Sequence, residues 1–195
     1  MARAQPLPDV VDEGLRTLFV GINPSLRSAE VGHHFAGRGN PFWRLLHAAG
    51  LTPEALAPED DGALLTFGLG VTNVCRRPTR SAAELTRPEL TAGAAELREK
   101  VRQLRPAVVA LVGVSLYPVV FPGGGEPGPG GKEATLGGAR VFVLPNPSGL
   151  NAAYPGFRDK LLWFERLRRF GQGLPPRAPR GPRRASARAA RSSDR

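Results

Sequence analysis

The sequence lacks the residues that build cross-linked or metal-bound proteins. Cys75 is its only cysteine, so one chain can form neither an internal disulfide nor a thiolate cluster for a metal. No H-E-x-x-H or C-x-x-C motif occurs. His33 and His34 are adjacent, so we expect their side chains to diverge rather than share a ligand. We therefore expect no metal and no cofactor.

Long apolar runs are missing as well. No run approaches the roughly 18–20 residues that a helix needs to cross a bilayer. The N-terminal stretch MARAQPLPDVVDEG has no apolar core of the kind found in signal peptides. These absences predict a cytoplasmic protein with no membrane partner, and no exposed apolar seam argues against a monomer.

Acidic residues are scarce relative to basic ones. The 195 residues include 27 Lys and Arg against 17 Asp and Glu, which gives a net charge of +10. Residues 174–195 hold seven arginines and one acid and have no apolar periodicity, so we expect a disordered tail. Non-specific attraction to DNA is its expected use, and the alternative is a tail that only aids solubility. Residues 1–14 resemble a loose lead-in, which leaves residues 15–173 as one domain.

The remaining residues alternate between strand-like and helix-like segments. Apolar runs at 16–22, 70–75, 107–113 and 140–145 predict strands. The capping box that begins at Thr86 and the amphipathic segment 157–170 predict helices, whereas the Gly-rich segment 123–131 predicts a flexible loop. This order indicates an α/β fold, a three-layer sandwich with a central, mostly parallel sheet of about four strands and helices on both faces.

Two predicted strands end in the same tripeptide, Asn-Pro-Ser. Asn23 follows the first strand and Asn146 follows the last, so both should lie at the carboxyl edge of the sheet, where such folds bind ligands. Proline biases the preceding residue toward extended geometry and thereby aims each amide. An amide donates and accepts hydrogen bonds but takes up no proton at neutral pH. These asparagines could position a ligand or water, or they could close Asx-type turns.

Other catalytic patterns are weak. Asp60 and Asp61 lie in a segment, PEDDG, that we expect to be exposed. The Gly-rich loop lacks the Gly-Lys-Ser/Thr ending of a phosphate loop, and no G-x-S-x-G elbow occurs.

Four blocks in order resemble one family. The segments GINPSLRSAEVGHHFAGRGNPFWRLLHAAGL, GVTNVCRRPT, ELTAGAAELREKV and VLPNPSGLN, within about residues 15–170, resemble the mismatch-specific uracil-DNA glycosylases, the group that includes thymine-DNA glycosylase. The resemblance implies a monofunctional enzyme of the bacterial cytoplasm or nucleoid. It would flip uracil out of a G·U pair in double-stranded DNA and hydrolyse the N-glycosidic bond, with thymine or modified cytosine as further substrates.

The resemblance also implies roles for particular residues. Asn23 would position the water and Asn146 would support the reacting centre. Phe35 would stack on the flipped base, Ile22 and Phe35 would offer main-chain groups to its edge, and Ser28 would line the pocket near the pyrimidine 5-position. Ser25 stands where many relatives have Gly, and Asn73 where some have Lys. The DNA wedge would be Gly149, Leu150 and Asn151.

Two other functions stay open at this point. One is a non-catalytic nucleic-acid-binding protein that uses the same cleft and the Arg-rich tail. The other is a general uracil glycosylase that also acts on single strands. The absence of a carboxylate directly after Gly21 and Ile22 argues against the general enzyme, which would use an Asp to polarise the water.

Overall fold

A computed structural model describes residues 6–148 and 153–173 as a three-layer α/β sandwich. The central sheet has five strands in the order β2-β1-β3-β5-β4. Four of them are parallel: β1 (Thr17–Gly21), β2 (Leu69–Asn73), β3 (Val108–Val112) and β5 (Ala139–Leu144). Their nearly continuous apolar sequence is explained by burial on both faces. The predicted fold class is confirmed.

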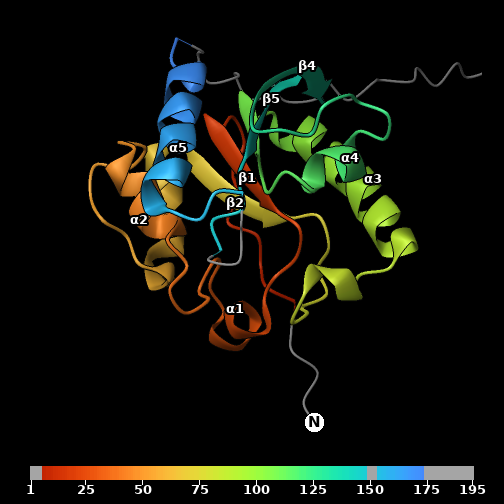
Figure 1. Cartoon of the computed structure of the whole chain (residues 1–195), viewed down its shortest axis with the longest axis horizontal. Coiled ribbons are helices and arrows are strands. Elements are labelled where there is room, and N and C mark those ends of the chain that lie inside the picture. The colour runs from red at the N-terminus through yellow and green to blue at the C-terminus, as the bar shows by residue number, and fades with distance from the viewer. Residues whose placement is uncertain (1–5, 149–152, 174–195) are drawn as a thin grey trace, which may run out of the picture.

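Helices cover both faces of this sheet (Figure 1). On one face, α2 (Phe42–Ala48) and α5 (Phe157–Gly171) pack against Phe19 and the other side chains pointing the same way. On the other face, α3 (Arg87–Leu104) and α4 (Leu116–Val120) pack against Leu18 and its equivalents. Successive residues of a strand point to opposite faces of the sheet and therefore belong to two separate apolar cores. Among the described residues, no helix is long and apolar enough to span a membrane.

The count of about four strands was one too few. The additional strand, β4 (Gly130–Leu136), is antiparallel to β5 and lies at the edge of the sheet. Its residues alternate between exposed and half-buried, so it has no apolar run to reveal it. Gly137 and Gly138 both have positive φ, as a two-residue hairpin turn requires. This Gly-Gly pair was the available sequence signal.

The segment before β1 is packed and not loose from residue 6 onward. Val10 exchanges two main-chain hydrogen bonds with Val71 of β2, at 3.0 and 2.8 Å. Asp9 accepts hydrogen bonds from Thr72 (2.6 Å) and from Lys100 of α3 (2.5 Å). Val10 and Val11 are only two apolar residues between Asp9 and Asp12, which is too short for a strand pattern, so this pairing was not predictable from periodicity.

Short elements lie in three of the connections between the main strands and helices. These are α1 (Leu26–Val31) after β1, the 3-10 helix η1 (Pro58–Phe67) before β2, and the 3-10 helix η2 (Ala82–Glu84) before α3. Thr86 caps α3 as its capping box predicts, with the Thr86 side chain accepting the Glu89 N–H. The segments around α1 and η2 contribute residues to the walls of the site.

Gly93 sets how closely α3 approaches the sheet. A Cβ at this position would lie 2.4 Å from the carbonyl oxygen of Val74, the residue after β2. We expect Gly93→Ala to destabilise the fold by about 1–3 kcal/mol, because a backbone atom cannot move aside. This loss outweighs the roughly 1 kcal/mol that Ala gains over Gly in a helix.

Urea unfolding of Gly93→Ala would measure this effect. Gly62→Ala is the matched control, because a Cβ at Gly62 would have no atom within 4 Å. Equal stability of Gly93→Ala and wild type would show that α3 is not held at this distance.

Candidate active site

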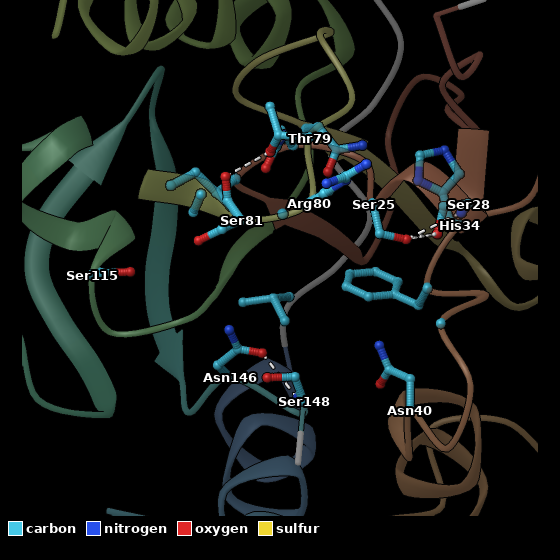
Figure 2. Close-up of a pocket in the computed structure, with 18 of the residues that line it drawn as sticks. Ser25, Ser28, His34, Asn40, Thr79, Arg80, Ser81, Ser115, Asn146 and Ser148 are labelled. Carbon is cyan, nitrogen blue, oxygen red and sulfur yellow. Dashed lines mark hydrogen bonds between the residues drawn. The ribbon is translucent and has the colours of Figure 1, made fainter. Parts of the chain in front are cut away.

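A cleft with a volume of about 630 Å³ opens at the carboxyl ends of the parallel strands. Figure 2 shows Thr79, Arg80 and Ser81 along one side of it and Asn146 and Ser148 along the opposite side. The family resemblance assigned roles to residues that are far apart in sequence. The described members of that set all line this one cleft: Ile22, Asn23, Ser25, Ser28, Phe35, Asn73 and Asn146.

Asn23 is held in one orientation by the segment that follows β2. Its Nδ2 lies 2.9 Å from the main-chain oxygen of Arg77 and 2.7 Å from Oγ1 of Thr79. A main-chain carbonyl only accepts hydrogen bonds, so the atom facing Arg77 must be the amide nitrogen. Both Nδ2 hydrogens are thus committed, while Oδ1 accepts no hydrogen bond from any described residue. Asn23 therefore offers the cleft a fixed acceptor.

Phe35 provides an aromatic surface in the cleft. Its ring stacks on Phe42, with centroids 3.9 Å apart and an interplanar angle of 21°. Phe42 is fully buried and meets Phe19 edge-on at 5.4 Å. Because one face of Phe35 rests on this buried cluster and the residue lines the cleft, its other face is left for a ligand.

The backbone of Phe35 is strained. Its φ of 53° lies in the left-handed region, which costs a non-Gly residue about 1–3 kcal/mol and persists only where the surroundings impose it. The imposed conformation places the ring between Phe42 and the cleft. Three hydrogen bonds hold the adjacent peptide groups: His34 N–H to Asp61 Oδ2 (3.1 Å), Trp43 Nε1–H to His34 O (3.2 Å) and Ala36 N–H to Ser28 Oγ (3.1 Å).

Asp61 was expected to be exposed, and the structure shows it buried, with 8% of its surface accessible. It accepts the His34 N–H, next to Phe35 in sequence, and its Oδ1 lies 3.3 Å from Nδ1 of His33. His34 is also buried, and burial lowers the pKa of its imidazole, which keeps the ring neutral at neutral pH. The side chains of Asp61 and His34 therefore help to fix the conformation of the loop that carries Phe35.

The two serines shape the turn between β1 and Phe35. Ser25 caps α1 by accepting the Ser28 N–H at 3.1 Å, and the two hydroxyls are 3.0 Å apart. Ser28 is buried and Ser25 is exposed. Asn73 at the end of β2 lies against Gly21, where a Cβ would come within 2.5 Å of Asn73 Oδ1. A side chain at Gly21 would therefore displace Asn73 from its place in the lining of the cleft.

Comparison with known proteins assigns the chain to a family. The model of the uracil DNA glycosylase superfamily matches residues 8–168. The chain belongs to the uracil DNA glycosylase superfamily. Its fold is similar to the solution structure of a protein from Methanosarcina acetivorans that is provisionally described as a uracil DNA glycosylase. That likeness has a TM-score of 0.55 at 22% identity and covers 85% of this chain and 98% of the other.

Membership in this superfamily implies a hydrolase that cleaves N-glycosidic bonds in DNA, and with it a role in base excision repair. The charges of the cleft suit an anionic polymer. Arg38 and Arg80 line it, and no Asp or Glu does among the described residues. Neither arginine has an ion-pair partner within the described part of the chain. Both are therefore available to a phosphate group.

The second Asn-Pro-Ser loop reaches the cleft from β5. Asn146 Oδ1 accepts the main-chain N–H of Ser148 at 2.9 Å, which is the geometry of an Asx turn. Asn146 therefore both closes an Asx turn and lines the cleft. The wedge predicted at Gly149, Leu150 and Asn151 lies outside the described residues, as does the Arg-rich tail. No group of three or more His, Cys, Asp or Glu among the described residues is placed to hold a metal ion.

Several cleft residues were missed in the sequence. Thr79, Arg80 and Ser81 come from one loop, and Asn40 and Ser115 come from two others. The RRPT segment forms the end of GVTNVCRRPT, one of the blocks that carry the family resemblance, but no residue of it was assigned a role. A polar Pro-Thr turn soon after a predicted strand was the signal available for Thr79, since the ends of parallel strands meet at one edge.

An ion pair anchors the loop that contacts Asn23. Arg77 Nε donates to Glu89 Oε1 at 2.6 Å, and Glu89 also accepts from Thr86 N–H and Oγ1, both at 2.8 Å. The Arg77 hydrogen bond, followed by those of Thr86, lowers the pKa of Glu89 to about 2. The carboxylate therefore stabilises the fold fully above its ordinary pKa of 4.5, and this contribution is lost as pH falls toward 2.

We expect Glu89→Gln to unfold at a lower temperature than wild type at neutral pH. Because the pair is exposed, the difference should be small and should shrink with added salt. Thermal unfolding of both proteins between pH 7 and pH 2 should show the two midpoints converging at the acid end. A gap that stays constant over this range would mean that the charge of Glu89 is not involved.

Proposed function

We propose that this chain removes uracil from G·U pairs in double-stranded DNA by hydrolysis and leaves an abasic site. It would act as a monomer without a cofactor, with thymine and modified cytosines as further substrates. The observation that carries the proposal is the amide of Asn23. Its two N–H groups are bound to protein, and its oxygen is left as an acceptor within a cleft of a glycosylase fold.

In this mechanism Asn23 Oδ1 accepts a hydrogen bond from the attacking water. The bond between C1′ of the sugar and N1 of uracil breaks, and its electron pair leaves with the base. The oxygen of the water bonds to C1′, and the water proton goes to solvent or to the released base. Asn23 orients the water without removing its proton, because an amide is not a base at neutral pH.

Phe35 and its neighbours would hold the extrahelical base. A base must leave the duplex for chemistry at its sugar bond, and stacking on an aromatic ring compensates part of the lost stacking. Main-chain groups of Ile22 and Phe35 would bind the base edge and stabilise negative charge on it. Ser28 and Asn73 would complete the pocket beside the pyrimidine ring.

Mismatch preference follows from weak activation of the water. Since no carboxylate lines the cleft among the described residues, bond breaking depends on a good leaving group and on easy access to the base. A G·U pair opens at lower cost than a Watson–Crick pair. Gly149, Leu150 and Asn151 would fill the gap that the flipped base leaves, with Leu150 as the apolar plug.

The first experiment compares four labelled DNAs that carry uracil or thymine at one central position. These are the G·U, A·U and G·T duplexes and the uracil single strand, each treated with enzyme and then with hot alkali. We expect the G·U duplex to be cut fastest and the A·U duplex and the single strand to be cut far more slowly. Equal cutting of all uracil substrates would indicate a general uracil glycosylase, and binding without cutting would indicate a non-catalytic binder.

Arg38 and Arg80 are expected to contact DNA phosphates on either side of the flipped nucleotide. Replacing either by Gln should weaken G·U duplex binding and reduce the slope of log K against log salt by about 1. Arg102→Gln is the matched control. Arg102 pairs with Glu99 on α3 and lies beside the Gly137 turn, at the amino end of β5 and therefore at the opposite end of the strands from the cleft. Fluorescence anisotropy over a salt series gives both quantities. An unchanged slope in both cleft variants would remove these contacts from the proposal.

A further inference from the structure

Thr79 has a more constrained role than other polar residues of the cleft. It is 56 residues from Asn23 in sequence, and its Oγ1 lies 2.7 Å from Asn23 Nδ2. The same oxygen lies 2.8 Å from the main-chain oxygen of Ser81. A hydroxyl has one hydrogen, and Ser81 can only accept it, so Oγ1 must act as an acceptor toward Asn23.

This bonding pattern fixes the polarity of the Asn23 amide. The Ser81 carbonyl orients the hydroxyl, and the hydroxyl then accepts only from a donor. If the amide were reversed, Asn23 Oδ1 would face two acceptors, Thr79 Oγ1 and the Arg77 carbonyl. Buried acceptors that face each other without a donor are costly. The two acceptors together therefore disfavour the reversed orientation, and removing the Thr79 hydroxyl weakens this preference.

Thr79 is itself held close to the turn that carries Asn23. Only 3% of its surface is exposed. Its N–H donates to the main-chain oxygen of Pro24 at 3.2 Å, and it forms an isolated parallel bridge with Ser25. A shift of Thr79 relative to the Asn23 turn would break these contacts.

The partner on the other side of the amide is also anchored. Arg77 gives its main-chain oxygen to Asn23, while its side chain binds the Glu89 carboxylate at 2.6 and 3.0 Å and the Glu84 carbonyl at 2.8 Å. The loop from 77 to 81 is thereby tied to the start of α3 at one end and to the Asn23 turn at the other.

We propose that Thr79 is a positioning residue that acts through Asn23: it sets which atom of the amide meets the attacking water. The inference rests on the proposed function, because the water is the reactant of that hydrolysis. Thr79 contacts neither the water nor the DNA in this scheme. Its loss should slow bond cleavage and leave DNA affinity unchanged.

The test compares Thr79→Val, which keeps the shape but removes the hydroxyl, with Thr79→Ser, which keeps the hydroxyl. Single-turnover cleavage of the G·U duplex at saturating enzyme should be on the order of 10–100-fold slower for Thr79→Val. Thr79→Ser should restore most of the rate, and duplex affinity should be the same in all three proteins.

Thr52→Val is the matched control for loss of a buried hydroxyl. Thr52 is 2% exposed and donates to the carbonyl of Glu54, two residues on, at 2.8 Å, just as Thr79 donates to Ser81. It does not line the cleft. We expect Thr52→Val to cleave at the wild-type rate.

A double variant separates positioning from a general structural effect. If Thr79 acts only through Asn23, adding Thr79→Val to Asn23→Ala should cause no further loss of rate. A further loss of the same size in the double variant would overturn the inference. A wild-type rate for Thr79→Val would overturn it as well.

Crystal structures of Thr79→Val and Thr79→Ser give a readout that does not require activity. We expect the Asn23 amide to leave the Arg77 carbonyl in Thr79→Val and to keep its place in Thr79→Ser. If the wild-type protein released no uracil, the proposed function would fail, and the amide positions would still decide this inference. An unmoved amide in Thr79→Val would then contradict it.

Discussion

Replacing Asn23 by Ala should reduce the rate of uracil excision from a G·U duplex by on the order of 10²–10³-fold, the loss typical of removing one pre-oriented polar group from an active site. The reason is that Oδ1 disappears while the rest of the cleft stays in place. The side chain points its N–H groups at Arg77 and Thr79, so duplex affinity should change little. Single-turnover kinetics with enzyme in excess over labelled duplex would separate the chemical step from binding.

The Asn23→Ala protein must be shown to be folded for this result to count. Its unfolding temperature and its affinity for the G·U duplex are the two controls. Because Arg77 and Thr79 lose a donor in this variant, a slightly lower unfolding temperature is expected. A folded variant that cleaves at the wild-type rate would show that the water is oriented by another group.

Replacing Phe35 by Ala should weaken capture of the flipped base by about 1–3 kcal/mol, which corresponds to roughly a 5- to 150-fold loss in rate at limiting enzyme. The loss arises because Ala offers no surface on which the base can stack. Phe35→Tyr should keep most of the activity and Phe35→Leu should lie in between, since Leu keeps apolar bulk without a π-face. Rates measured below saturation report this binding term.

The backbone of Phe35 allows a second check on the same position. At a φ of 53°, Gly is unstrained and Ala is not, so Phe35→Gly should be at least as stable as Phe35→Ala in urea. In most loops the flexible Gly would be the less stable of the two. Activity should be low in both variants, because neither has a ring. Full activity in Phe35→Gly would show that the base does not stack here.

The parts of the fold that could be predicted are those with strong local signals. The parallel strands are apolar on both faces, and α3 begins at a capping box that the structure reproduces at Thr86. The edge strand β4 could not be found in this way, because one of its faces is open to solvent and its residues are mostly polar or small. Burial that depends on a distant partner leaves no periodicity in the local sequence.

The site also contains residues that could be predicted from the sequence and residues that could not. Asn23 and Asn146 could be placed at one edge of the sheet, because parallel strands share their direction and proline fixes each turn. The partners of Asn23 could not, because Arg77 and Thr79 come from a loop more than 50 residues away along the chain. The burial of Asp61 was not predictable for a similar reason. Its partner, the His34 N–H, becomes its neighbour only in the folded chain.

The cleft also explains why a slow enzyme is expected. In the proposed mechanism Asn23 would orient the water, Phe35 would stack on the base and the arginines would bind phosphate. None of the described lining residues is a carboxylate that could take a proton from water. Selectivity would then come from how readily a base leaves the duplex and from how well it departs as an anion.

The most direct measurement of the central claim is free uracil itself. A duplex with one G·U pair would be incubated with the protein, and the released base and the DNA strands would be quantified by mass spectrometry without alkali. We predict one free uracil for each duplex consumed and a uracil-containing strand that stays unbroken but has become abasic. A duplex that is bound at saturating protein yet releases no uracil would contradict hydrolysis of its glycosidic bond by this cleft.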